Sequence, residues 1–341
     1  MSDPSERRVG RRTFFKIAGA AGAAGAAAGC SPRAATERLV PWIVPPEDIV
    51  PGQPLYYRTA CRECSAGCGV TARTREGRAT KLEGNPEDPV GRGALCARGQ
   101  AAVQALYHPE RFRGPMRRGS DGALAPISWD DAEDALAKAV TAAAAKGPGR
   151  VRLLTRLEPG STGAVQRAFL KAAGARPADR LVLEPFDPAP LRIAAASLLG
   201  ASGLPVFDLA AARSIVAFGA DFLETWRSPV EGARQLAAGR GRIGEDRTRL
   251  TWVGPRLALT GISADRWIRC RSGGEAAVAL GMLRVLLDPA RDIPVTAKTR
   301  ALAARAAHLP AQDLANRAGV PWSEIEALAL KLARRRPSAL L

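Results

Sequence analysis

The alternation of apolar and polar positions predicts a small β-rich part near the N-terminus. The stretch GVTARTREGRATKLEG, residues 69–84, alternates around the turn Glu76-Gly77. Alternation on both sides of a Gly-containing turn is typical of a β-hairpin. Glycines cluster around this stretch, at Gly67, Gly69, Gly91 and Gly93, and allow tight turns. We therefore expect a small β-rich cap here.

Downstream, short apolar runs alternate with helical patterns. Ser128 with Asp131 resembles a capping box at the start of a helix that Gly147-Pro148-Gly149 ends. Further helices are expected over about 164–173, 274–287 and 322–335, and strands in VRLLT, RLVLE, SIVAFG, RLTWVG and the terminal RPSALL. Strands that alternate with helices indicate βαβ units. The fold class is therefore α/β, with a β-rich cap followed by a mainly parallel α/β body.

The first thirty residues predict an export signal. A polar basic start with Arg11-Arg12 before Thr13-Phe14-Phe15-Lys16 precedes a weakly apolar Ala/Gly stretch. The pair of arginines and the low hydrophobicity resemble a twin-arginine signal, whose route carries folded proteins. An ordinary secretory signal or a membrane anchor is the alternative, but the apolar stretch is short for a membrane span.

Cys30 closes the sequence AAAGC, which resembles a lipoprotein processing site, although Ala27 stands where leucine is usual. Acylation of Cys30 and cleavage at a nearby small residue both remain open. The Pro-rich residues 31–53 predict an extended tether. The expected division is a signal peptide over 1–30, this tether, an iron-sulfur domain over 54–117 and an α/β domain over 118–341.

Charge and composition exclude few classes of function. The formal net charge of +17 comes from 50 basic against 33 acidic residues in 341, and the excess is spread along the chain. No basic helix with interleaved aromatic residues is present, so we expect no nucleic-acid partner. The chain has only two histidines, His108 and His308. A metal site must therefore use mainly sulfur or carboxylate ligands.

Four of the six cysteines lie close together in the sequence. Cys61, Cys64 and Cys68 form C-x2-C-x3-C, and Cys96 follows after 27 residues. One tight loop can thus offer three thiolates to a compact cluster while the fourth comes from a distant turn, as a four-iron cluster requires. A zinc site usually has two C-x2-C pairs, and a c-type haem needs histidine where Ser65 stands. Two disulfides remain an alternative in an exported protein.

The cysteine spacing and the segments KLEGNPEDPVGRGALCARGQ and ISWDDAEDALA together carry a family resemblance. This region resembles the N-terminal iron-sulfur region of the molybdopterin oxidoreductase superfamily, the relatives of dimethyl-sulfoxide reductase. The resemblance implies a 4Fe-4S cluster on the four cysteines. It also places Arg98 where the family has a cation between cluster and pterin. Family members are longer, so the C-terminal pterin-binding domain is expected to be missing. A split gene, a fragment and a premature end are open alternatives.

A second stretch resembles the molybdopterin-like region of the iron-sulfur subunit of alternative complex III, a quinol-oxidising complex; the menaquinone reductase complex has a similar subunit. This stretch comprises IVAFGADFLETW and DRWIRCRSGGEAA. Catalytic relatives carry W-G-x-N-P and R-P-G-T-D motifs that hold the pterin. Here Ala220-Asp221 replaces the Asn-Pro pair, and Arg271, Gly273 and Glu275 give a partial match. We expect these three residues to be vestigial pterin contacts.

Molybdenum in the resembled family usually takes one protein ligand, from the loop LEPFDPAPLRIAAAS here. That loop has no cysteine, Ser197 lies inside a helical pattern, and Asp187 before Pro188 is a typical turn residue. Cys270 is expected to be a buried apolar residue. We therefore expect no bound molybdenum bis-pterin dinucleotide.

The favoured hypothesis is an electron-transfer or scaffold subunit of a membrane-associated, quinol-oxidising complex on the periplasmic side. The resemblance implies three partners, namely a ferredoxin-like multi-cluster polypeptide, an integral membrane quinone-binding subunit and c-type cytochrome subunits. One alternative is a molybdenum enzyme acting on a small oxyanion or sulfur compound. The other is a cofactor-free assembly scaffold whose cysteines form disulfides.

Overall fold

A computed structural model describes residues 49–158, 160–186, 188–288, 290–291 and 308–341. The chain divides into two compact units, residues 1–50 and residues 51–341, and the second unit holds all elements described below. Arg11, Arg12, Cys30 and most of the expected tether lie outside the described residues. No helix of the described part combines the length and apolar character needed to cross a membrane.

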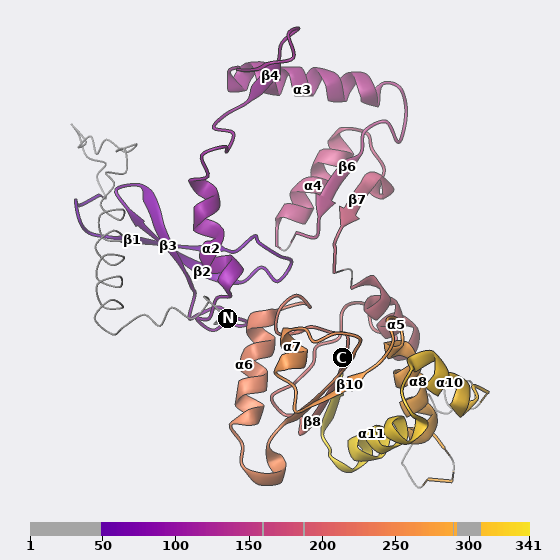
Figure 1. Cartoon of the computed structure of the whole chain (residues 1–341). Coiled ribbons are helices and arrows are strands. Elements are labelled where there is room, and N and C mark those ends of the chain that lie inside the picture. The colour runs from indigo at the N-terminus through magenta and orange to yellow at the C-terminus, as the bar shows by residue number, and fades with distance from the viewer. Residues whose placement is uncertain (1–48, 159, 187, 289, 292–307) are drawn as a thin grey trace, which may run out of the picture. The chain divides into compact units, whose positions relative to one another are not determined.

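The N-terminal part of the second unit is an antiparallel sheet in the order β1-β2-β3 (Figure 1). Its strands are β1 (Leu55–Ala60), β2 (Gly69–Arg75) and β3 (Arg78–Gly84). The predicted β2–β3 hairpin is confirmed, and its two turn residues Glu76 and Gly77 have positive φ angles of 49° and 78°. Strand β1 was not predicted, because its residues show no clear alternation. Helix α2 (Ala97–Leu106) packs on β3.

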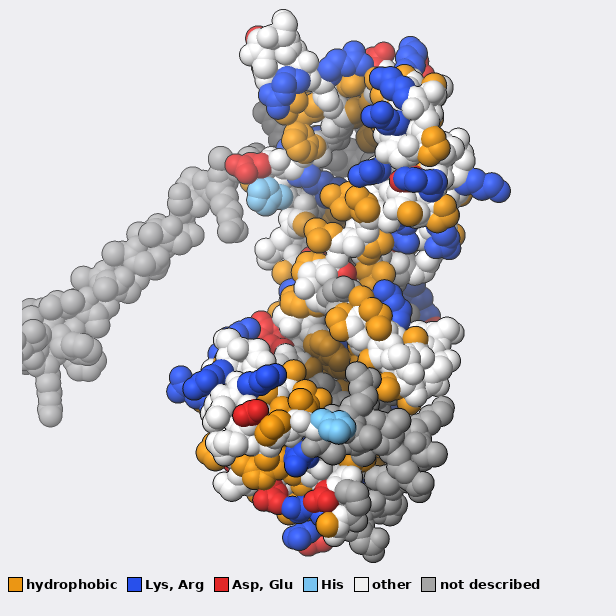
Figure 2. All heavy atoms as spheres, turned by 90° about the vertical axis from the view of Figure 1, so that its right-hand side faces the viewer, with side chains coloured by type: hydrophobic (Ala, Val, Ile, Leu, Met, Phe, Trp, Pro, Cys, Tyr) orange, Lys and Arg blue, Asp and Glu red, His pale blue; other side chains and the backbone are white. Residues whose placement is uncertain are grey.

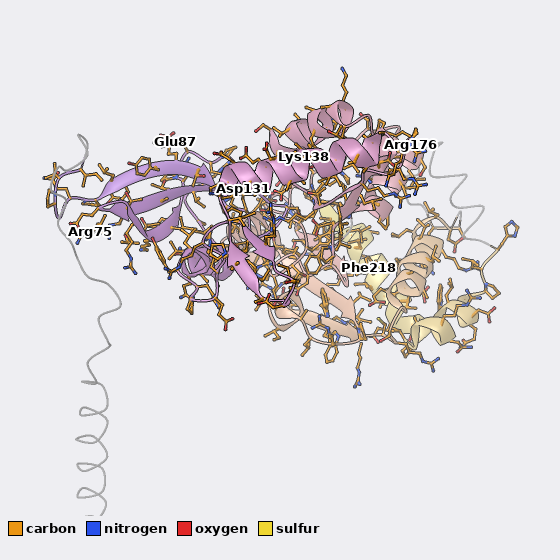
Figure 3. All side chains as sticks on the ribbon, turned by 90° about the horizontal axis from the view of Figure 1, so that it is seen from above. Arg75, Glu87, Asp131, Lys138, Arg176 and Phe218 are labelled. Atoms are coloured by element: carbon orange, nitrogen blue, oxygen red, sulfur yellow. The ribbon has the colours of Figure 1, made fainter. Side chains whose placement is uncertain are left out.

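A short hairpin, β4 (Met116–Arg118) with β5 (Leu124–Pro126), precedes helix α3 (Trp129–Ala144). The predicted helix start is confirmed: the Ser128 hydroxyl accepts a hydrogen bond from the Asp131 amide at 3.0 Å. The same hydroxyl donates to the Asp131 carboxylate at 2.6 Å, which fixes the cap further. Asp131 and Lys138 mark α3 in Figure 3.

The next elements form a small βαβ unit. Strand β6 (Leu153–Arg156) is followed by α4 (Thr162–Ala172), the short 3-10 helix η1 (Pro177–Asp179), β7 (Arg180–Leu183) and α5 (Ala189–Leu199). Strands β6 and β7 pair in parallel as a separate two-stranded sheet. The strands and their parallel pairing were predicted, and the structure divides them between two parallel sheets. Apolar patterning indicates strands without indicating their partners.

The C-terminal part holds a four-stranded, all-parallel sheet in the order β10-β9-β8-β11. The strands are β8 (Ser214–Phe218), β9 (Arg249–Gly254), β10 (Arg266–Arg269) and β11 (Ser338–Leu340). The helices are α6 (Pro229–Arg240), α7 (Leu259–Ile262), α8 (Glu275–Leu286), α10 (Ala311–Ala318) and α11 (Trp322–Arg334), with a 3-10 turn η2 (Gly244–Asp246) before β9. The predicted strands and late helices are confirmed, and β10 is an unpredicted addition.

This four-stranded sheet is covered on both faces, because successive side chains of a strand point to opposite sides. Val216 of β8, Val253 of β9 and Ile268 of β10 pack with buried residues of α8, α10 and α11. The neighbouring Ile215 and Leu250 pack on the other face, with residues of α6 and the start of α7. Figure 1 shows these two helix groups around the sheet. The α/β class is therefore confirmed, and this sheet carries the main core.

Candidate metal centre

Three of the four clustered cysteines lie in one loop at the edge of the antiparallel sheet. Cys61 directly follows β1, Cys68 directly precedes β2, and Cys64 lies between them. The Cys61 amide donates a hydrogen bond to the Cys68 carbonyl at 2.8 Å, which closes the loop. The antiparallel pairing of β1 with β2 ends at Ala60 opposite Gly69. The sheet register therefore brings the first and third cysteines together.

The fourth cysteine comes from a separate turn. Cys96 is the N-cap residue of α2, with extended backbone angles. The turn before it is held by Asn85, whose carbonyl accepts from the Asp88 and Gly93 amides at 3.0 Å each. The Asn85 amide donates to the Gly69 carbonyl at 2.9 Å, so this turn is fixed to the start of β2 beside Cys68. Gly93 has φ +86°, a conformation that suits glycine.

Three of the four thiols share one packed environment. Cys61 and Cys68 are buried, Cys64 and Cys96 are partly buried, and all four are free. Cys61 and Cys68 belong to one apolar cluster with Val70 of β2 and Val230 of α6, and Cys96 packs against it. The first turn of α6 therefore contributes to the walls of this cysteine site.

Burial and the neighbouring thiols raise the pKa of Cys61 and of Cys68 when no metal is bound. Burial raises the pKa of Cys68 to about 11, and the nearby Cys64, Cys61 and Cys96 add to this shift. Burial also raises the pKa of Cys61, with further contributions from Cys64 and Cys96. A bound metal reverses this balance, because metal coordination favours the thiolate. The site thus favours a ligand that brings several positive charges.

The number and the spacing of the cysteines fit a four-iron cluster. A tetrahedral zinc site holds sulfurs 2.3 Å from one metal and thus about 3.8 Å from each other. Among the described residues, no group of three or more His, Cys, Asp or Glu is arranged to hold a single ion. Cys61, Cys68 and Cys96 contact one packed cluster, and Cys64 lies in the loop between Cys61 and Cys68. A four-iron cluster with one cysteine per iron matches this wider set.

A buried carboxylate connects the cysteine loop to the end of β6. Arg62, which lies between Cys61 and Cys64, pairs with one carboxylate oxygen of Glu158 at 2.9 Å. Arg156 pairs with the other oxygen at 2.8 Å, and the Glu158 side chain is only 8% exposed. The hydrogen bond from Arg156 lowers the pKa of Glu158. Burial acts in the opposite direction, and the hydrogen bond from Arg62 lowers the pKa further. Sequence reasoning missed Glu158, because nothing in its local sequence distinguishes it from other acidic loop residues.

Arg98 contacts the backbone of the α/β body. Its guanidinium donates a hydrogen bond to the Glu224 carbonyl at 2.9 Å, in the loop after β8. Residues 98 and 224 are far apart in sequence, so Arg98 joins the cysteine domain to the α/β body. Its predicted role beside the cluster and a pterin remains a prediction.

The three expected pterin contacts follow β10, and Arg271 and Glu275 have different neighbours. Arg271 donates to the Asn316 carbonyl at 3.1 Å, and its side chain lies against Gly319. Glu275, at the start of α8, lies beside Gly219 after β8. Gly273 has φ +77° and forms the turn between them. In this arrangement Arg271 faces the α10–α11 turn, and Glu275 lies at the carboxyl end of β8.

Asp221, which stands where catalytic relatives have Asn-Pro, is used internally. Its carboxylate is buried and accepts hydrogen bonds from the Thr260 amide at 3.0 Å and the Thr260 hydroxyl at 2.6 Å. The Thr260 hydroxyl accepts from the Leu223 amide at 3.0 Å. Asp221 thus fixes the loop after β8 to α7. In the sequence, Asp221 stands out only because it departs from the family motif, and its partner Thr260 could not be predicted.

A cavity of about 290 Å³ lies between the loop before β8 and the start of α6. Phe207 and Trp226 form one wall, with ring centroids 5.8 Å apart, and the Arg227 guanidinium lies 5.6 Å from the Trp226 ring. Val90, from the turn before Cys96, also lines it. Sequence reasoning did not identify this cavity, because its residues come from segments without a motif.

The remaining candidates are Asp187, Ser197 and Cys270. Asp187, the one possible molybdenum ligand, lies outside the described residues. Ser197 lies within α5 and donates to the Ala194 carbonyl at 3.2 Å, as its helical pattern predicted. Cys270 is a buried member of the core on the α8 face of the sheet, which confirms its expected apolar role.

Comparison with known proteins agrees with the cysteine site. Residues 55–108 match the molybdopterin oxidoreductase Fe4S4 domain, a range that includes all four clustered cysteines. This match identifies a 4Fe-4S cluster as the cofactor type of the domain.

Three curated relatives match most of the chain. The molybdopterin-binding-like subunit of a menaquinone reductase from Nitratidesulfovibrio vulgaris is 30% identical over 289 residues, 84% of this chain and 40% of that subunit. The molybdopterin-containing subunit of a thiosulfate reductase from Salmonella typhimurium is 28% identical over 82% of this chain and 35% of its own length. That of an arsenate respiratory reductase from Shewanella is 28% identical over 68% of this chain and 27% of its own.

A solved structure has the same fold. Acetylene hydratase from Pelobacter acetylenicus superposes with a TM-score of 0.63 at 20% identity, over 83% of this chain and 39% of that protein. The chain thus spans well under half the length of each of these four proteins.

Proposed function

The chain is a member of the molybdopterin oxidoreductase superfamily, and from this premise we propose that it is an iron-sulfur electron-transfer and scaffold subunit of a quinol-oxidising complex. The observation that carries the proposal is the convergence of four free cysteines in the Fe4S4 domain. Cys61, Cys68 and Cys96 pack in one apolar cluster, and Cys64 lies in the loop between Cys61 and Cys68. These four residues would hold the cluster. When bound, such a cluster supplies one-electron transfer.

The surrounding residues have distinct tasks in this proposal. The Cys61–Cys68 hydrogen bond keeps the loop closed, and the turn at Asn85 holds Cys96 near it. Apolar contacts from Val70 and Val230 exclude water on one side. Arg62 and Arg156 surround the Glu158 carboxylate, so the loop is connected to β6. A rigid, partly dry site of this kind lowers the structural change that accompanies a change of charge.

Two observations favour a non-catalytic body over a molybdenum enzyme. The Asp221 carboxylate accepts hydrogen bonds from Thr260. Arg271 faces Asn316 and Gly319, so neither side chain is directed to a common cofactor site. The molybdenum enzyme, acting on a small oxyanion or sulfur compound, is the second candidate. Its support is the thiosulfate and arsenate reductase names of two relatives.

The proposed setting is the periplasmic face of the cytoplasmic membrane, after twin-arginine export and with or without acylation of Cys30. The proposed partners are a multi-cluster ferredoxin-like polypeptide, an integral membrane quinone-binding subunit and c-type cytochrome subunits. A menaquinone reductase subunit among the relatives supports a quinone-linked complex. Electrons would pass between such partners through or alongside this chain.

Metal analysis of the full chain tests the proposal. The protein is purified without oxygen, and its iron, inorganic sulfide and molybdenum are measured together with the paramagnetic resonance of the reduced form. We expect about four iron and four sulfide per chain, a reduced-state signal and no molybdenum. Stoichiometric molybdenum would favour the second candidate. Absence of iron together with two disulfides, detected by mass before and after reduction, would favour a cofactor-free scaffold.

A further inference from the structure

A cavity of about 510 Å³ lies at the amino ends of the strands of the four-stranded parallel sheet. Arg213, which lines it, directly precedes β8, and Glu245 belongs to the η2 turn before β9. The other lining residues come from α11 and its C-cap residue. Ligand sites of open parallel sheets normally lie at the carboxyl ends of the strands. This cavity is therefore separate from the Asp221 loop, which follows the carboxyl end of β8.

One face of α11 supplies both apolar and basic groups to the cavity. The lining residues of this helix are three or four positions apart and so lie on one side of it: Ala327, Leu330, Lys331 and Arg334. The opposite side of α11 packs into the core through four buried residues: Ile325, Leu328, Ala329 and Leu332. Because these core contacts fix the rotation of the helix, its basic side chains are directed away from the core.

Arg335, the C-cap residue of α11, holds the walls of the cavity together. Its guanidinium donates hydrogen bonds to the carbonyls of Arg213 at 3.1 Å, Glu245 at 2.7 Å and Arg247 at 2.8 Å. The end of α11, the start of β8 and the η2 turn, which are remote in sequence, thus meet at one side chain. Since a carbonyl carries no net charge, these bonds fix the position of the Arg335 charge without neutralising it.

The cavity holds more positive than negative charge. Four of its seven lining residues are Lys or Arg, and Glu245 is the acidic one. Asp246 pairs with Arg213, whereas the side chains of Lys331 and Arg334 have no ion pair or hydrogen bond within the described part of the chain. The negative end of the α11 dipole offsets about half a charge, so a surplus of about 1.5 positive charges remains.

Positive charge alone would indicate little in this chain, which has 50 basic and 33 acidic residues. Figure 2 shows Lys and Arg side chains scattered over the face that it draws. The site at the amino ends of the strands differs from such scattered residues because its four cations line one cavity. Arg335 also fixes the segments that carry them. Fixed cations around one volume are the requirement for binding a compact anion.

A phosphate monoester matches the charge and the size of this cavity. It carries about 1.5 to 2 negative charges at pH 7 and three strong acceptor oxygens. We propose that the cavity binds an organic phosphate monoester, with its phosphate on Lys331 and Arg334 and its organic part against Ala327 and Leu330. A volume of about 510 Å³ has room for both parts. The ester is either a soluble small molecule or a lipid headgroup of the phosphatidic acid type.

This proposal does not rest on the iron-sulfur cluster or on electron transfer. Failure of cluster assembly in the metal analysis would leave it intact, and its own failure would leave the cluster assignment intact.

Calorimetric titration of the full chain with phenyl phosphate tests the proposal. This probe combines a phosphate monoester with a small apolar ring, and phenyl sulfate, which has the same ring and a single charge, is the matched control. We expect phenyl phosphate to bind and to raise the thermal midpoint of the chain. Phenyl sulfate should bind more weakly by about tenfold or more.

Matched variants locate the binding. Lys331 and Lys171 are both exposed lysines in the last turn of a helix, α11 and α4 respectively, so their replacement has a similar effect on the helix itself. Lys331→Glu should weaken phenyl phosphate binding by about tenfold or more, and Lys171→Glu should leave it unchanged. Arg334→Glu should act as Lys331→Glu does, so a folding defect in one variant, detected by circular dichroism, leaves the other as the test.

Vesicles distinguish the two sources of the ester. Binding to phosphatidylcholine vesicles that contain phosphatidic acid, lost in Lys331→Glu and kept in Lys171→Glu, would assign the site to a lipid headgroup. Binding of phenyl phosphate without binding to these vesicles would assign it to a soluble ester.

Three results would overturn the proposal. The first is that neither phenyl phosphate nor the phosphatidic acid vesicles bind. The second is that phenyl phosphate and phenyl sulfate bind equally, or that Lys331→Glu and Lys171→Glu have equal effects. The third is that a polyglutamate peptide binds while both phosphate probes fail, which would assign the cavity to an acidic polypeptide.

Discussion

Arg62 and Glu158 form an ion pair 2.9 Å long that joins the cysteine loop to the end of β6. The Glu158 side chain is nearly buried, whereas Arg62 and Arg156, the two arginines that pair with it, are largely exposed. One carboxylate therefore serves two arginines, one of which lies directly between two expected cluster ligands. The charge of Glu158 is held close to the site at which the proposed cluster changes its own charge.

Replacement of Glu158 by glutamine should raise the reduction potential of the cluster, because a nearby negative charge that disfavours the reduced form is lost. The expected shift is on the order of tens of millivolts. A redox titration followed by paramagnetic resonance measures it. Glu324→Gln, which removes a carboxylate paired with Arg266 elsewhere in the body, is the matched control and should leave the potential unchanged. Equal shifts in both variants would contradict a local effect of Glu158.

Replacement of Cys64 by serine should reduce the iron bound per chain well below the parent value, because one proposed ligand is lost. Cys64 is the partly buried cysteine of the loop, so the fold should tolerate the change. Cys270→Ser is the control in a buried, non-clustered cysteine and should keep the iron, with some loss of stability. Iron and sulfide analysis, with circular dichroism for folding, distinguishes the two. Full iron in Cys64→Ser would remove Cys64 from the ligand set.

Asp265 makes the stability of the parallel sheet depend on pH. Burial raises the pKa of Asp265. The hydrogen bond from the Leu250 amide and the charges of Arg240, Arg249 and Arg247 outweigh burial, so the pKa of Asp265 is lowered. A lowered pKa means stability that is present above the ordinary aspartate value of about 4 and is lost as the pH falls through the folded-state pKa.

Asp265→Asn should therefore unfold more easily at pH 7, by about 1–2 kcal/mol, while the difference from the parent shrinks below about pH 4. Denaturant unfolding at pH 7 and below about pH 4 measures the difference in unfolding free energy between the variant and the parent. A difference that stays constant with pH would show that the carboxylate charge has no part in it.

Gly232 allows α6 to approach the loop after β8. A Cβ atom at this position would lie 2.6 Å from the Phe222 carbonyl and 2.9 Å from its ring. Gly232→Ala should lower the free energy of unfolding by about 1–3 kcal/mol through overpacking. Gly241→Ala, at the end of the same helix with neighbours no closer than 3.5 Å, should be neutral or stabilising. Similar thermal midpoints for the two variants would contradict this packing argument.

Sequence patterns predicted elements more reliably than they predicted partners. The β2–β3 hairpin, strands β8 and β9 and helices α8 and α11 follow from periodicity that is visible locally. Strand β10 was missed because its four residues, RWIR, hold only two apolar positions between two arginines, too short a run to stand out. That β6 and β7 form their own sheet is decided by distant contacts, which local patterns do not contain.

The residues of the candidate site also differ in whether the sequence could predict them. Spacing alone indicated the four cysteines, since the ligands of one cluster must come from tight turns. Glu158, Asp221 and the Phe207–Trp226 wall could not be predicted, because each gains its role from a residue remote in sequence. The Arg98 contact with Glu224 is of the same kind.

The pairing of β11 with β8 has a consequence for the order of folding. The Val216 carbonyl accepts a hydrogen bond from the Leu341 amide at 2.9 Å, across a sequence separation of 125 residues. Closing a loop of this length costs about 4 kcal/mol of chain entropy before any contact is gained. The β8–β9 pair and its helices can form from nearer residues, so β11 should join a sheet that is already assembled. The sheet edge beside β8 is then the last part of the core to become ordered, and the slowest to be shielded from other chains.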